Sequence, residues 1–183
     1  MKITAFAATS SRNSINKQLV TYATGLLDSA QVEILDLNDY EMPLFSEDRE
    51  VELGHPEAAR QFLERIANSD AVIISFAEHN GSYTVAYKNV FDWASRINPK
   101  VFQSKPVVFL ATSPGPGGAN SVLSSAVDSA PFFDGEVKAS LSIPSFYENF
   151  DTESGRLTNV ELNDRLSDAV RSLDPVEAEA IYA

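Results

Sequence analysis

Three polar segments carry the residue types that could hold a phosphorylated ligand. In residues 9–16, six of the eight side chains are hydroxyls or amides, and Arg12 adds a positive charge. An apolar helical pattern begins at Ile15, and the start of a helix attracts anions through its free backbone N–H groups and its dipole. Ser14 alone would suffice as an ordinary N-cap of that helix. The density of donors therefore favours a phosphate site over a simple cap.

The second segment, residues 78–82, has the sequence Glu-His-Asn-Gly-Ser and follows a nearly continuous apolar run. Gly81 permits a positive φ or a close approach to a ligand, so backbone amides here could face the polar edge of a planar group. Asn80 could stack on that group or donate to it. Capping of the following helix by Asn80 or Ser82 explains the segment equally well. His79 has only one other histidine in the chain, His55, so we expect no metal site.

The third segment, residues 113–118, has the sequence Ser-Pro-Gly-Pro-Gly-Gly. It partly matches a dinucleotide-binding fingerprint, but Asn120 stands where the last glycine would be, and the segment follows a late strand instead of the first. Proline and glycine together predict a fixed loop whose amides can approach a flat ring. A tight strand-to-helix turn would need only one or two of these glycines.

Apolar runs alternate with amphipathic helical patterns along the chain. The expected strands are residues 2–8, 31–37, 70–77, 106–111 and 136–143. The expected helices are residues 15–26, 56–66, 83–94, 119–129 and 159–173. Residues 38–56 and 144–155 are expected to be irregular.

This alternation predicts an α/β fold with a parallel sheet and helices on both faces. Right-handed crossovers leave few topologies for such a chain. A sheet of five strands suits the flavodoxin-like three-layer sandwich with strand order 2-1-3-4-5. The first, third and fourth strands then end at one edge of the sheet, so the three polar segments should meet there.

Composition limits the class of protein. A chain of 183 residues is expected to form one domain, residues 1–183, and 44% hydrophobic with 22% charged residues is typical of a soluble globular protein. Cysteine is absent, which excludes disulfides and thiolate chemistry. The net charge of −12 argues against a nucleic-acid partner. No apolar run approaches the roughly 20 residues that span a bilayer, and no signal peptide is apparent, so we expect a cytoplasmic protein.

The motifs resemble those of the NADPH-dependent FMN reductase family of flavodoxin-like proteins. In the family pattern Gly-Ser-x-Arg-x-x-Ser-x-Asn, the Ser, Ser and Asn places are taken by Thr9, Ser14 and Asn16. The family's Pro-Glu-Tyr-Asn-Gly/His-Ser motif is matched by residues 77–82, and its Lys-Asn-x-x-Asp-Trp helix by residues 88–93. Its Ser-Pro-Gly-x-x-Gly-Gly loop is matched by residues 113–118 with one residue fewer. The resemblance covers residues 2–143 in order and spacing.

The resemblance implies tightly bound FMN. The residues expected to hold its phosphate are Thr9, Ser11, Ser14 and Asn16, with Arg12 close by. The residues expected to line its ring are Glu78, His79, Asn80 and Gly81 on one side and Ser113, Gly115 and Gly118 on the other. The chain departs from the family where Ser11 replaces the arginine of the phosphate loop, Ala77 replaces a proline and His79 replaces a tyrosine.

The function implied by the resemblance is hydride transfer from NAD(P)H to the flavin and then to a flavin, quinone or similar small acceptor. The flavin would carry the chemistry, so no side chain is expected to be catalytic. A homodimer or homotetramer is expected, with no nucleic-acid or membrane partner. Two alternatives remain open. One is a flavodoxin-like electron carrier without reductase turnover, and the other is a phosphate- or nucleotide-sensing protein that has lost flavin.

Overall fold

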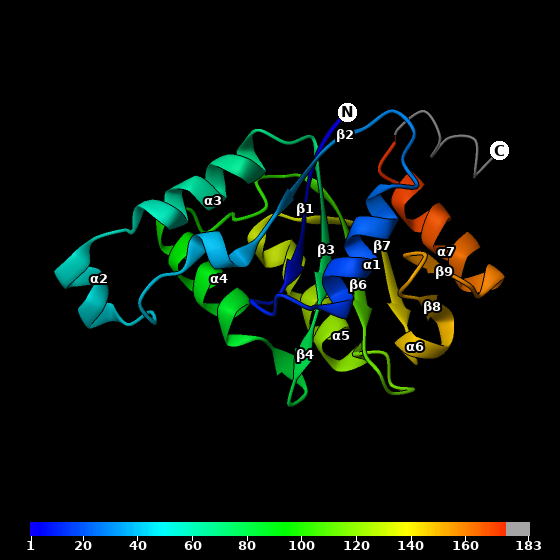
Figure 1. The fold of residues 1–183 in the computed structure, drawn as a ribbon. Helices are drawn as coiled ribbons and strands as arrows, with labels where there is room; N and C mark the ends of the chain where they lie inside the picture. The colour runs from blue at the N-terminus through cyan, green and yellow to red at the C-terminus, as the bar shows by residue number, and fades with distance from the viewer. Residues whose placement is uncertain (175–183) are drawn as a thin grey trace.

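The computed structural model describes residues 1–174, and residues 175–183 lie outside its described part. A parallel sheet with the order β2-β1-β3-β6-β7 runs through the molecule (Figure 1). Its strands are β1 Lys2–Ala8, β2 Gln31–Leu35, β3 Ala71–Phe76, β6 Pro106–Thr112 and β7 Glu136–Ile143. Counted along the chain, these strands have the predicted order 2-1-3-4-5, which confirms the flavodoxin-like topology.

Burial explains the order of the strands. All six residues of β3 are buried, and so are all residues of β1 after Lys2. Such continuous apolar runs need cover on both faces of a parallel sheet, so these strands lie at its centre. The outer strands β2 and β7 have several exposed residues, as strands at the edges of a sheet can.

Helices cover both faces of the sheet (Figure 1). The long helices are α1 Ile15–Thr24, α3 Glu57–Ala67, α4 Val85–Ile97, α5 Asn120–Ser129 and α7 Val160–Arg171. On one face, Phe62 of α3, Trp93 of α4 and Val122 of α5 belong to one hydrophobic cluster. On the other face, Leu19 of α1 and Leu166 of α7 belong to a second cluster. The two clusters, with the sheet between them, confirm the predicted three layers.

The prediction of an irregular segment at residues 38–56 is wrong. The segment contains most of a 3₁₀ helix, Leu37–Tyr40, and all of α2, Glu47–Leu53. Ser46 caps α2, and three acidic residues in the first turn of α2 suit the positive end of its dipole. None of the α2 residues is buried, so the segment lacks the apolar periodicity that would have indicated a helix.

The prediction of an irregular loop at residues 144–155 is also wrong in part. It contains α6, Phe146–Asn149, followed by β8, Phe150–Asp151, which pairs with β9, Arg156–Leu157. The rings of Phe146 and Phe150 stack with centroids 4.6 Å apart, and both side chains are buried. Within residues 1–174, no helix combines the length and the apolar character needed to cross a bilayer.

Candidate functional site

Three loops follow neighbouring strands at the carboxyl edge of the sheet. We call them loop 1 (residues 9–14, between β1 and α1), loop 2 (residues 77–84, between β3 and α4) and loop 3 (residues 113–119, between β6 and α5). Because β1, β3 and β6 are parallel neighbours, all three loops leave the sheet at the same edge. Ligands of open α/β sheets bind outside this edge.

Loop 1 has an ordered backbone and an exposed polar surface. Thr9 is buried, and its hydroxyl accepts a hydrogen bond from the Ser11 N–H at 3.2 Å. Ser14 is the N-cap of α1, because its hydroxyl accepts from the Lys17 N–H at 3.3 Å. The intervening residues 10–13 are exposed. The N–H groups of Ile15 and Asn16 lie in the first turn, where a helix offers them no acceptor. The loop therefore combines a real cap with free donors for an anion.

Asn16 has a role that the sequence did not reveal. Its side chain is almost fully buried, and its Nδ2 donates to the Thr112 carbonyl at 3.2 Å. Its Oδ1 accepts from the Ser75 hydroxyl at 2.8 Å and from the Thr112 N–H at 3.2 Å. The side chain thus ties α1 to β3 and β6. A contribution of Asn16 to phosphate binding would come from its backbone N–H.

Loop 2 contains a small hairpin, which projects at the carboxyl edge where β4 is labelled in Figure 1. Strands β4, Glu78–His79, and β5, Ser82–Tyr83, pair antiparallel around a turn of two residues. Asn80 and Gly81 both have positive φ, +54° and +77°. Asn-Gly is the preferred pair for such a turn, so the sequence did contain a signal for this hairpin. The exposed His79 lies beside the turn, at the end of β4.

Thr84 caps α4, so the alternative in which Asn80 or Ser82 caps this helix is wrong. The buried Thr84 hydroxyl accepts from the Tyr87 N–H at 3.2 Å and donates to the Ala8 carbonyl at 2.8 Å. The second bond fastens the end of loop 2 to the end of β1. The expected helix began at residue 83, two residues before α4 begins, so Thr84 was placed inside the helix instead of at its cap.

Glu78 caps a helix that is distant in sequence. The first helix residues of α5 follow Ala119, which adopts a left-handed conformation and provides no side-chain cap. The carboxylate of Glu78 instead accepts from the Val122 N–H at 2.9 Å, where the dipole of α5 favours a negative charge. Glu78 therefore joins loop 2 to the helix that begins at the end of loop 3.

The glycines of loop 3 have different surroundings. Gly118 has a φ of +58°, and an added Cβ would lie 2.1 Å from the Ser142 hydroxyl, which donates to the Gly118 carbonyl. A Cβ at Gly115 or Gly117 would meet no atom within 4 Å. The Gly115 carbonyl accepts from the Ser113 hydroxyl at 3.2 Å and from the Ser145 N–H at 2.9 Å. Loop 3 is thus held against β7 at Gly118, whereas the space where a Gly115 side chain would lie is unfilled.

Side chains tie the three loops to one another in pairs. The Asn16 side chain joins the helix after loop 1 to Thr112, the residue before loop 3. Thr84 joins loop 2 to the residue before loop 1, and Glu78 joins loop 2 to the helix after loop 3. These three side chains therefore connect loops 1, 2 and 3 into one frame at the carboxyl edge. Such a frame can hold a phosphate at loop 1 and present amides from loops 2 and 3 to a planar group.

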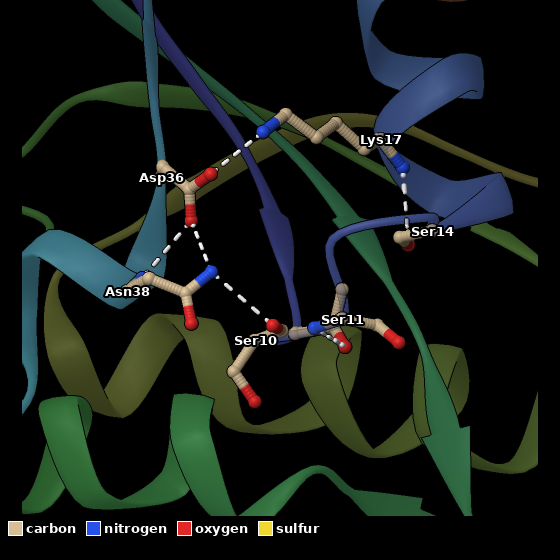
Figure 2. A network of polar contacts seen from close by, with 7 residues as sticks. Ser10, Ser11, Ser14, Lys17, Asp36 and Asn38 are labelled. Carbon is tan, nitrogen blue, oxygen red and sulfur yellow. Dashed lines mark hydrogen bonds and ion pairs between the residues drawn. The ribbon is translucent and has the colours of Figure 1, made fainter.

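A second polar network joins loop 1 to the end of β2, and three of its residues, Lys17, Asp36 and Asn38, were not predicted from the sequence. Figure 2 shows Lys17, Asp36, Asn38 and Ser10 joined by successive contacts. The Lys17 ammonium lies 2.6 Å from Asp36 and, together with hydrogen bonds from Asn38, lowers the pKa of the Asp36 carboxyl to about 2. A polar residue directly after β2 was the available signal, because that strand also ends at the carboxyl edge.

The Lys-Asn-x-x-Asp-Trp motif of α4 has a structural role here. Asn89 accepts from the Phe45 N–H at 2.8 Å and donates to the Met42 carbonyl at 3.0 Å, while the Trp93 indole donates to the Pro43 carbonyl at 2.7 Å. Lys88 and Asp92 form an ion pair one turn apart at 2.6 Å. The motif thus fastens the segment before α2 to α4.

The fold and the connected loops define a flavodoxin-like α/β protein. Residues 1–141 match the family model described as NADPH-dependent FMN reductase, and the chain belongs to this family.

Curated relatives include an NADPH:quinone oxidoreductase of Arabidopsis thaliana, 32% identical in an alignment 112 residues long that covers 55% of this chain and 56% of that one. An NAD(P)H-dependent FMN reductase of Pseudomonas aeruginosa is 32% identical over 116 residues, 63% of this chain and 61% of that one. A 2-hydroxy-1,4-benzoquinone reductase of a Burkholderia species is 34% identical over 117 residues, 63% of this chain and 62% of that one. The chain thus matches less than two thirds of the length of each of these relatives.

Solved structures share the fold along nearly the whole chain. FerB, a flavoenzyme NAD(P)H:(acceptor) oxidoreductase of Paracoccus denitrificans, superposes with a TM-score of 0.75 at 23% identity, covering 97% of each chain. An FMN-dependent NADH-azoreductase of Bacillus anthracis in complex with FMN superposes with a TM-score of 0.66 at 10% identity, covering 94% of this chain and 98% of that one. At these identities the likeness concerns the fold.

Proposed function

We propose that this protein is an oxidoreductase that binds FMN at the carboxyl edge of its sheet and passes electrons from NAD(P)H to a small quinone-type acceptor. The observation that carries the proposal is the connected frame of loops 1, 2 and 3 (residues 9–14, 77–84 and 113–119), held together by Asn16, Thr84 and Glu78. Membership of the FMN reductase family and the activities for which the relatives are named support the same conclusion.

The donor set fits the phosphate of FMN. Loop 1 offers the exposed hydroxyls of Ser10 and Ser11 and the free first-turn N–H groups of α1. Arg12, also exposed, can add a positive charge in place of the family's arginine at the Ser11 position. In this proposal the hydroxyls of Thr9 and Ser14 hold the loop in shape while its amides bind the phosphate.

The ring would lie between loops 2 and 3. The open space beside Gly81 and Gly115 lets backbone amides approach a flat group without hindrance from a side chain. The proposed ring-facing residues are His79, Asn80 and Gly81 on one side and Ser113 and Gly115 on the other. Glu78 and Gly118 would act by holding their loops in place, because their contacts lie within the protein.

Bound FMN would accept hydride from NAD(P)H and deliver electrons to the acceptor. The protein would position the donor and the acceptor over the ring and exclude competing reactions. We assign no acid or base, because a hydride transfer of this kind needs none from the chain.

We also propose that the protein forms a homodimer or homotetramer in the cytoplasm. Sedimentation of the purified protein tests the oligomeric state.

Steady-state turnover tests the proposal. Protein reconstituted with FMN should oxidise NADPH or NADH in the presence of 1,4-benzoquinone much faster than the same concentration of free FMN. Reconstitution with riboflavin, which lacks the phosphate, is the matched control and should leave little activity. A protein that binds FMN without turnover would favour an electron carrier, and one that binds no FMN would contradict the proposed function.

A further inference from the structure

The peptide between Ser10 and Ser11 is held at both of its polar ends. Its carbonyl, on Ser10, accepts from the Asn38 side-chain amide at 3.2 Å. Its N–H, on Ser11, donates to the Thr9 hydroxyl at 3.2 Å. With both groups bonded, the plane of this peptide is held in the observed orientation, which limits the positions open to the following residues of loop 1. Thr9 belongs to the loop, but Asn38 comes from outside it, after β2.

Asn38 is itself fixed by Asp36. One carboxylate oxygen of Asp36 accepts from the Asn38 backbone N–H at 3.0 Å and from the Asn38 side-chain amide at 2.7 Å. The two protons of that amide are thus divided between Asp36 and the Ser10 carbonyl. Because both partners are acceptors, the Asn38 side chain can bond both of them only with its NH₂ group turned toward them.

The other carboxylate oxygen of Asp36 connects the network to α1. It accepts from the Lys17 ammonium at 2.6 Å, and Lys17 lies in the first turn of α1 beside the N-cap Ser14 (Figure 2). The end of β2 is therefore bonded both to loop 1 and to the helix that the loop opens. An isolated surface ion pair would stabilise little, but here the pair is the last link in a chain of contacts from Ser10 through Asn38 and Asp36 to Lys17.

The ion pair also makes this chain of contacts compatible with a bound anion. A lone carboxylate beside loop 1 would repel a phosphate dianion. The positive charge of Lys17 offsets the negative charge of Asp36, so these contacts can hold loop 1 without adding net negative charge at the site.

We propose that Asn38 and Asp36 are positioning residues of loop 1, which make the site selective for a phosphorylated flavin over its dephosphorylated form. This inference rests on the proposed function. Neither residue touches the phosphate in this account. Asn38 acts through the Ser10 peptide, and Asp36 acts by orienting Asn38 and pairing with Lys17.

Paired titrations with FMN and riboflavin test this inference through the quenching of flavin fluorescence. Asn38→Ala removes the donor to the Ser10 carbonyl, and we expect it to weaken FMN binding about tenfold while riboflavin binding changes less than twofold. Asn38→Asp has the same shape, lacks the donor and adds a charge, so its loss of FMN affinity should be at least as large. A general structural defect would weaken the binding of FMN and of riboflavin by similar factors. The ratio of the two dissociation constants therefore reports on the positioning of loop 1.

Asn98→Ala is the matched control. Asn98 is the C-cap of α4, at the opposite edge of the sheet, and accepts a hydrogen bond from the Lys100 N–H at 3.0 Å. Its replacement should leave the ratio unchanged. A wild-type protein that binds FMN, together with an unchanged ratio in both Asn38 variants, would overturn this inference alone. A wild-type protein that binds neither flavin would overturn the proposed function as well.

Discussion

Asn16 and Thr112 exchange two hydrogen bonds across 96 residues of sequence, each at 3.2 Å and each between the Asn16 side chain and the Thr112 backbone. The same Asn16 oxygen accepts from the Ser75 hydroxyl. All three residues are buried, so water cannot replace a partner that is removed. One side chain therefore satisfies the backbone at the end of β6 and holds the start of α1 against two central strands.

Asn16→Ala should lower the free energy of unfolding by about 2–3 kcal/mol, because it leaves the Ser75 hydroxyl and the Thr112 N–H buried without a partner. Urea unfolding followed by circular dichroism measures this loss. Asn13→Ala, at an exposed position of loop 1, should stay within about 0.5 kcal/mol of wild type. Equal free energies of unfolding for the two variants would show that the hydrogen bonds of Asn16 do not stabilise the fold.

Glu78→Ala should destabilise the start of α5 by about 1 kcal/mol, the usual cost of losing a helix cap. Its most direct sign is faster hydrogen exchange of the Val122 amide, which donates to Glu78. Glu78→Gln keeps an acceptor at the same place and should retain most of the protection. Unchanged exchange at Val122 in the alanine variant would contradict the role of Glu78 as a cap.

Gly118 and Gly115 should respond differently to alanine. Gly118→Ala forces a Cβ to within 2.1 Å of the Ser142 hydroxyl at a φ of +58°, and we expect a loss of about 2 kcal/mol or more in unfolding free energy. Gly115→Ala meets no atom within 4 Å and should be neutral for stability. If Gly115 faces the flavin ring, the same variant should bind FMN about tenfold more weakly. Unchanged FMN binding would remove Gly115 from the proposed site.

The pH dependence of stability should report on Asp36. Its pKa is lowered from 3.8 to about 2, chiefly by the hydrogen bond from Lys17, so its carboxylate binds a proton more readily in the unfolded chain. The stability that it contributes is therefore complete above about pH 4 and is lost as the pH falls toward 2. In urea unfolding, the difference between wild type and Asp36→Asn should shrink across this range. Asp39→Asn, at an exposed neighbour, is the control, and a difference that stays constant would contradict the shifted pKa.

The sheet was predictable because its strands are short apolar runs separated by polar segments. The run at β3 is buried along its whole length, and its sequence pattern alone indicated a central strand. Helix α2 was not predicted because it buries no residue and so shows no apolar period. The hairpin of loop 2 was not predicted either, although Asn80-Gly81 is a strong turn signal.

The connections within the site could not be predicted in the same way. Lys17 meets Asp36 because the pairing of β1 with β2 brings the start of α1 beside the end of β2. Glu78 meets Val122 because β3 and β6 are neighbours. Such contacts depend on the register of the sheet and on the path of each loop, which residue types and local spacing do not determine. The motifs therefore identified the loops, while the structure identified the side chains that connect them.

The visible absorption spectrum of the protein reconstituted with FMN, recorded before and after anaerobic addition of NADPH or NADH, tests the central claim most directly. We expect a protein-bound flavin spectrum that bleaches on addition of the nucleotide and recovers when 1,4-benzoquinone is added. A protein that retains no flavin after gel filtration, or a bound flavin that neither nucleotide bleaches, would contradict it.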